Sequence, residues 1–159
     1  MDEMTKLKSE MKVYLAGGWF DDEQMERLEA VKKIIIDLGY GIFSPKDEAL
    51  CSPDSSMDWR RQVYEGNINA IRTCNFMVAI TDKKDIGTIH ETGIASALNI
   101  PIVYFAETLG DNKFNLMLAQ SGTAVAKSRD ELSKILNDPN FVASLFSHIT
   151  YKEYTGNIE

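Results

Sequence analysis

Short apolar runs alternate along the chain with longer segments in which apolar residues recur every three to four positions. Five runs are typical of buried strands, the last more weakly than the others: residues 12–16, 40–43, 76–80, 102–105 and 124–126. Helical spacing covers residues 23–38 and 57–72, and a further helix is expected to follow the glycines near residue 90. Strands that alternate with helices in this way favour a mostly parallel sheet with helices on both faces.

The strand count narrows the topology. For a doubly wound sheet of five parallel strands, the flavodoxin-like order 2-1-3-4-5 is the commonest arrangement, and we predict it here. In that order the chain changes direction between the first and third strands, and ligands bind at such a switch point. The turn that follows residue 16 and the segment 85–91 would then meet at one crevice.

The length of 159 residues corresponds to one ordinary domain, which we assign to residues 11–159. Residues 1–10 alternate in charge and are expected to form a flexible N-terminal segment. The polar stretch 45–56 is too long for a simple connection, and loops of this length often close over ligands.

Charge and composition exclude several classes of function. The net charge of −7 opposes binding to phosphate backbones and anionic lipids, so we expect neither nucleic acid nor membrane as a partner. Cys51 and Cys74 stand in no metal-binding pattern, and the glycine-rich fingerprints of dinucleotide and nucleotide sites are missing. We therefore predict a cytoplasmic protein with reduced thiols that needs no metal or cofactor.

Two carboxylates flank a glycine turn in the segment 85–93, directly after the apolar run 76–80. Thr88 and Glu91 have the spacing of a capping box, which would make both residues purely structural. Alternatively, Glu91 in the first helical turn would be kept ionised by the helix dipole and could attack an electrophilic sugar carbon. Asp85 would then exchange a proton with the leaving group, unless it only forms the turn.

A second candidate feature is the turn Gly17-Gly18-Trp19-Phe20, which ends the first strand. Aromatic residues at the mouth of a pocket suit the flat face of a nucleobase, although a strand-to-helix turn with no ligand would have a similar sequence. Tyr14 precedes this turn within the strand, and a buried phenol needs a hydrogen-bond partner. Glu91 is our candidate for that partner.

The chain resembles nucleoside 2-deoxyribosyltransferases in four segments that share the family's order and spacing: residues 13–20, 67–75, 85–93 and 115–117. The Gly-Trp-Phe sequence at residues 18–20 and the Asp-x-Gly-x-x-x-Glu-x-Gly sequence at residues 85–93 are fairly specific in combination. The resemblance covers roughly residues 11 to 126.

The resemblance implies double displacement at the anomeric carbon of a 2-deoxyribose, with net retention. Glu91 matches the family nucleophile, Tyr14 the phenol that positions it, and Asp85 the residue that exchanges a proton with the base. The implied substrate-binding residues are Gly17, Trp19, Phe20, Trp59, Asn67, Gly87, Asn115 and Met117. The substrates would be deoxynucleosides and free purine or pyrimidine bases, as in nucleoside salvage.

The resemblance also implies a homo-oligomer built from dimers with shared active sites. Three departures from the family bear on specificity: Asn67 replaces an Asp, residues 118–124 lack the Asn that in the family reaches the sugar of a neighbouring subunit, and the tail 154–159 lacks the terminal aromatic residue. Two other functions stay open. One is a hydrolase that cleaves 2′-deoxynucleoside 5′-monophosphates, and the other is a nucleoside-binding module without catalysis.

Overall fold

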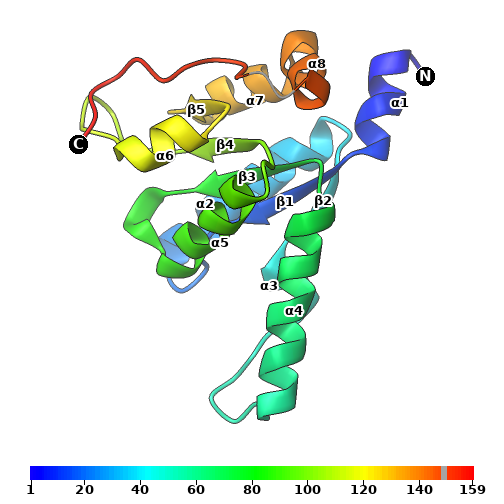
Figure 1. Ribbon diagram of the computed structural model, residues 1–159, viewed down its shortest axis with the longest axis vertical. Coiled ribbons are helices and arrows are strands. Elements are labelled where there is room, and N and C mark those ends of the chain that lie inside the picture. Colours follow the sequence, from blue (N-terminus) through cyan, green and yellow to red (C-terminus); the bar gives the residue numbers. More distant parts are fainter. Residues whose placement is uncertain (148–149) are drawn as a thin grey trace.

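A five-stranded, all-parallel sheet forms the centre of the computed structural model, which describes residues 1–147 and 150–159 (Figure 1). The strands lie in the order β2-β1-β3-β4-β5. Their bounds are Lys12–Ala16 for β1, Gly41–Phe43 for β2, Phe76–Ile80 for β3, Ile102–Phe105 for β4 and Ala124–Ala126 for β5. The predicted doubly wound, flavodoxin-like sheet and its order 2-1-3-4-5 are confirmed.

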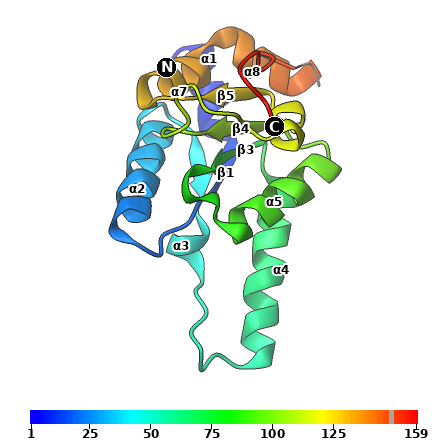
Figure 2. The ribbon, with the colours of Figure 1, turned by 90° about the vertical axis from the view of Figure 1, so that its left-hand side faces the viewer.

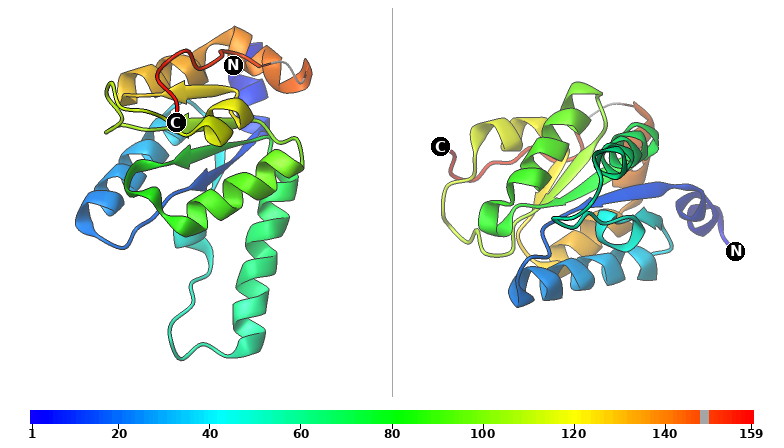
Figure 3. Two further views of the ribbon diagram at one scale, coloured as in Figure 1. Left: turned by 60° about the vertical axis from the view of Figure 1, so that its left-hand side comes forward. Right: turned by 90° about the horizontal axis from the view of Figure 1, so that it is seen from below.

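Helices cover both faces of the sheet (Figure 3). One face packs against α1 (Glu3–Glu10), α2 (Asp22–Asp37), α7 (Arg129–Asn137) and α8 (Pro139–Ser147). The other face packs against α4 (Met57–Thr73), α5 (Ile86–Ala97) and α6 (Leu116–Ser121). The short helices α3 (Pro45–Glu48) and η1 (Asp82–Lys84) lie in the connections. Within the described ranges, no helix has the length and apolar character that a membrane span needs.

Alternation along β1 determines which side chains reach each layer. Val13 and Leu15 belong to the core beneath α2 and α7, whereas Tyr14 and Ala16 belong to the core beneath α4 and α5. Successive side chains of a strand point to opposite faces of the sheet, so this division follows directly from the sequence. Tyr14 therefore points toward the layer that contains α5.

The N-terminal segment differs from expectation because residues 3–10 form α1 rather than an irregular stretch. The Asp2 carboxylate caps the helix by accepting a hydrogen bond from the Thr5 N–H at 2.7 Å. Met4 and Leu7 pack against the core, and the buried Lys8 ammonium donates to Asn137 at 2.6 Å. An isolated helix of this length is not stable in water. Its stability comes from docking, which charge alternation does not reveal.

Helix α4 projects beyond the sheet as an arm, with the connection from α3 running beside it (Figure 2). Ala70 and Ile71, near its C-terminal end, are buried in the core. Residues nearer its N-terminal end are exposed, including Met57 at 73%, Trp59 at 40% and Tyr64 at 55%. The part of the predicted long loop that follows α3 is thus held mainly by α4, because the Arg60 guanidinium donates to two of its carbonyl groups.

Candidate active site

The turn after β1 is shaped by close packing. A Cβ atom on Gly17 would lie 3.0 Å from the Leu28 side chain, and one on Gly18 would lie 2.6 Å from the Gln24 amide. The glycines therefore let α2 approach the end of β1. The rings of the next two residues, Trp19 and Phe20, stack with their centroids 5.2 Å apart. Trp19 is half-buried against the core, whereas Phe20 is 72% exposed.

Asp85, not Thr88, is the N-cap of α5. The Asp85 Oδ2 accepts hydrogen bonds from the Thr88 N–H at 2.8 Å and from the Thr88 hydroxyl at 2.7 Å. The capping box proposed for Thr88 and Glu91 is therefore wrong, because the helix begins three residues earlier than that motif requires. Glu91 consequently falls in the second turn of α5, away from the N–H groups at the helix start.

The side chain of Glu91 instead meets Tyr14, as the sequence predicted. The buried Tyr14 hydroxyl donates a hydrogen bond to Glu91 Oε2. Burial and the neighbouring Glu91 charge raise the pKa of Tyr14, which keeps the phenol protonated as a donor. Phe43 stacks on the Tyr14 ring at 5.4 Å, from the adjacent position of β2. Sequence reasoning missed Phe43, although its place in the second strand predicts that contact once the register is known.

The Glu91 carboxyl titrates near neutrality. Burial is the main cause that raises its pKa, the hydrogen bond from Tyr14 lowers it and the Asp85 charge raises it, so that the pKa is about 7. This corrects the expectation that the helix dipole keeps Glu91 ionised: desolvation is the larger effect, and the residue lies outside the first turn. A carboxyl with this pKa can exist in either protonation state at physiological pH, as groups in active sites often do.

The other predicted residues lie on several elements. Gly87 is in the first turn of α5, beside Asp85, and the half-buried Asn67 belongs to α4. Trp59, on the arm, donates its indole N–H to the Leu50 carbonyl at 2.9 Å. Asn115 caps α6 by accepting from the Met117 N–H at 3.0 Å, and Met117 is 75% exposed.

A cavity of about 950 Å³ lies beyond the carboxyl ends of β3 and β4. Its lining combines η1, the β4–α6 connection, α6 and the C-terminal segment, and it includes Asn115 and Met117. Tyr14, Asp85 and Glu91 lie outside this lining. The C-terminal segment is held there because the Phe114 N–H donates to the Asn157 carbonyl at 2.8 Å. Of the predicted residues, Asn115 and Met117 thus line the cavity, whereas the contact between Tyr14 and Glu91 lies outside it.

Across residues 1–147 and 150–159, no three His, Cys, Asp or Glu side chains are grouped so that they could hold a metal ion. A half-buried carboxyl that is paired with a buried phenol at the carboxyl end of an α/β sheet defines a candidate enzyme acting on a small molecule.

Comparison with known proteins identifies the family. The model of the family described as nucleoside 2-deoxyribosyltransferase matches residues 13–128. The chain belongs to this family of glycosyl-transferring enzymes. It is 30% identical over 135 residues to a nucleoside deoxyribosyltransferase of Limosilactobacillus fermentum, a match that spans 75% of this chain and 80% of that protein.

Solved structures agree with this assignment. The 2-deoxyribosyltransferase of Bacillus psychrosaccharolyticus is similar with a TM-score of 0.71 and 26% identity, over 84% of this chain and 95% of that one. A CMP N-glycosidase of Clostridium botulinum shares the fold, with a TM-score of 0.55 and 20% identity over 79% of this chain and 97% of that one.

The raised pKa of Glu91 predicts a pH-dependent contribution to stability. An unperturbed Glu carboxyl has a pKa of 4.5, and that of folded Glu91 is about 7, so the folded state binds the proton more tightly. The contribution is therefore fully present below about pH 4.5 and is lost as the pH rises through 7. Relative to Glu91→Gln, the wild type should lose roughly 2 to 3 kcal/mol of unfolding free energy between these limits.

Denaturant unfolding of the two proteins at pH 4.5, 6, 7 and 8 measures this difference. Groups other than Glu91 titrate in both proteins, so their effects cancel. A difference that stays constant over the series would contradict the raised pKa.

Proposed function

We propose that the protein transfers 2-deoxyribose between nucleobases, in cytoplasmic nucleoside salvage, with Glu91 as the nucleophile. The observation that carries this proposal is the half-buried Glu91 carboxyl, which accepts a hydrogen bond from the buried Tyr14 phenol in a chain of the deoxyribosyltransferase family. A fixed carboxylate oxygen is suited to attack an anomeric carbon, as carboxylates do in retaining glycosidases.

The reaction proceeds in two displacements. In the first, a Glu91 oxygen bonds to the anomeric carbon while the carbon–nitrogen bond to the base breaks, and its electron pair leaves with the base. In the second, a nitrogen of another base attacks the same carbon, and the ester bond returns its electrons to Glu91. Each displacement inverts the carbon, so the overall result is retention with ping-pong kinetics.

Asp85 exchanges a proton with the base in this scheme. Its Oδ2 is engaged by Thr88, which fixes the carboxyl group, and its other oxygen accepts no hydrogen bond from the described residues. Trp19 and Phe20 would stack on the base, and Asn67 would contact the substrate without the charge of the Asp that it replaces. Gly87, Trp59, Asn115 and Met117 complete the proposed substrate contacts.

Removing the nucleophile should abolish exchange. We expect Glu91→Ala and Glu91→Gln to reduce transfer of deoxyribose from thymidine to adenine by at least about 10³-fold, because no ester can form. The wild-type kcat/KM for thymidine should fall as the pH drops below about 7, where Glu91 becomes protonated. Chromatography of the nucleosides over time measures both effects.

Exchange that persists in Glu91→Ala would contradict the proposed mechanism. If thymidine raises the melting temperature of the wild type but no free base is ever released, the protein is a nucleoside-binding module instead.

A hydrolase is the second candidate, because the fold is shared with a CMP N-glycosidase. Asp21 and Asp22 stand at the start of α2, where they disfavour a 5′-phosphate. Comparing thymidine with its 5′-monophosphate, each with and without adenine, separates the two activities. A transferase releases thymine from the unphosphorylated donor and needs adenine for turnover, whereas a hydrolase prefers the monophosphate and does not respond to adenine.

We also infer a homo-oligomer in which copies of the chain share active sites. The exposed apolar residues of the α4 arm, Met57, Trp59 and Tyr64, support this inference because exposed apolar patches mark interfaces. Light scattering at assay concentrations should give a mass of at least two chains, and Tyr64→Glu should lower both the mass and the activity. A monomer with full activity would contradict the shared site.

A further inference from the structure

The connection that leads to Asp85 has an unusual backbone. Lys83 and Lys84 both adopt the left-handed conformation, with φ of 61° and 50°. Two consecutive residues with a side chain rarely occupy this region, and they stay there only where surrounding contacts hold them. The Asp85 side chain follows immediately, so whatever holds this turn also determines where Asp85 lies.

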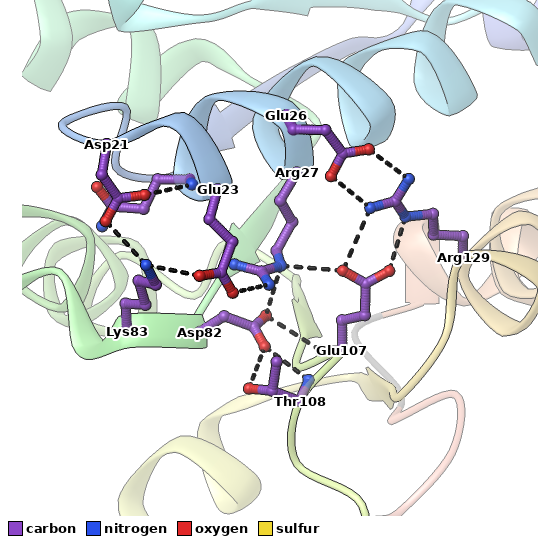
Figure 4. A network of polar contacts seen from close by, with 10 residues as sticks. Asp21, Glu23, Glu26, Arg27, Asp82, Lys83, Glu107, Thr108 and Arg129 are labelled. Carbon is purple, nitrogen blue, oxygen red and sulfur yellow. Dashed lines mark hydrogen bonds and ion pairs between the residues drawn. The ribbon is translucent and has the colours of Figure 1, made fainter.

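Ion pairs hold the turn on the side of α2. The Lys83 ammonium lies 2.9 Å from Asp21 Oδ2 and 2.7 Å from Glu23 Oε2 (Figure 4). Asp21 is also the N-cap of α2 and is joined directly to Phe20. Lys83 therefore links the proton-exchanging residue to the loop that carries the aromatic pair.

Hydrogen bonds hold the turn on the side of β4. The buried Asp82 carboxylate accepts from the Glu107 N–H at 3.1 Å, from the Thr108 N–H at 2.7 Å and from the Thr108 hydroxyl at 2.6 Å. These contacts fix the residue before Lys83 to the end of β4. The left-handed turn is thus held by contacts to α2 on one side and to the residues that follow β4 on the other.

A buried guanidinium joins the two sides. Arg27 is only 4% exposed and donates to Glu23 Oε1 at 3.0 Å and to Glu107 Oε2 at 2.9 Å (Figure 4). Its Nε also lies 3.9 Å from Asp82 Oδ2. Glu23 pairs with both Arg27 and Lys83, so the ion pair of Lys83 at the surface shares a carboxylate with the buried Arg27. Such a network holds its members more firmly than an isolated surface pair does.

We propose that Lys83 is a positioning residue, whose ion pairs with Asp21 and Glu23 fix the Trp19–Phe20 loop relative to Asp85. This inference rests on the proposed function, because it assigns the base to the space between that loop and Asp85. The Tyr14–Glu91 pair is formed by β1 and α5 and does not depend on these ion pairs. Loss of Lys83 should therefore impair handling of the base and change the titration of Glu91 little, because burial is the main cause of its raised pKa.

The test compares Lys83→Met with Lys84→Met and Lys83→Arg. Lys84 is a matched control because it has the same charge and a similar backbone, and no ion pair of Lys84 is found within residues 1–147 and 150–159. Lys83→Met should lower kcat/KM for base exchange by roughly five- to fiftyfold, mainly through a higher KM for the acceptor base. Lys84→Met should stay within about twofold of wild type, and Lys83→Arg should recover most of the loss.

Two further measurements distinguish a positioning role from a loss of stability. The melting temperature of Lys83→Met should lie within about 3 °C of wild type, because the pair is partly exposed. The acid limb of the pH profile should stay close to that of wild type, because burial is the main cause of the raised Glu91 pKa. If Lys83→Met matches Lys84→Met in activity, or if its loss follows a large fall in melting temperature, the positioning role is overturned.

A fluorescence measurement keeps this test independent of the proposed function. The chain has two tryptophans, so a Trp59→Phe background isolates the signal of Trp19. Adding Lys83→Met should make Trp19 more accessible to acrylamide quenching, whereas adding Lys84→Met should not. If wild type lacks exchange but Lys83→Met still increases the quenching of Trp19, the proposed function fails and the positioning role of Lys83 stands. Equal quenching in both variants overturns the positioning role of Lys83.

Discussion

The hydrogen bond between one half-buried carboxyl group and one buried phenol is the interaction on which the site depends. Glu91 lies in a poorly solvated position, where its charged form is costly, and the Tyr14 hydroxyl offsets only part of that cost. The contact requires that α5 pack on the face of the sheet to which the Tyr14 side chain points. The small side chains of Ala16 and Ala79 lie in register on that same face.

Two loops at the carboxyl edge of the sheet are held in place by different kinds of contact. The turn after β1 is rigid because glycines allow α2 to pack closely against it, whereas the connection after β3 is rigid because charged groups hold a strained backbone. Buried Arg27 links these loops to the end of β4. Asp85 caps α5 and Glu91 lies within it, so the contacts that hold the start of this helix bear on the positions of both carboxyl groups.

Much of this could be predicted from the sequence because the signals are local. The strands have continuous apolar runs, Gly39 ends the pattern of α2, and Tyr14 needs a partner that only a few polar residues can supply. The cap of α5 was misplaced by three residues because Asp85 and Thr88 are both good caps, and periodicity does not choose between them. With the helix start placed at Thr88, Glu91 falls in the first turn, where the helix dipole would favour its charged form. In the second turn that effect is weaker than the cost of burying the charge. Residues such as Phe43, Arg27 and Lys83 act through contacts between distant segments, which local patterns do not contain.

The covalent ester on Glu91 is the central claim, and its direct detection is the decisive measurement. The enzyme is mixed with thymidine at pH 7 without an acceptor base, quenched in acid within one turnover and digested for mass spectrometry. We predict that the peptide containing Glu91 gains the mass of one 2-deoxyribosyl group, that adenine added before the quench removes it, and that Glu91→Gln never carries it. Release of thymine by the wild type with no modified peptide, or modification of a different residue, would contradict this account.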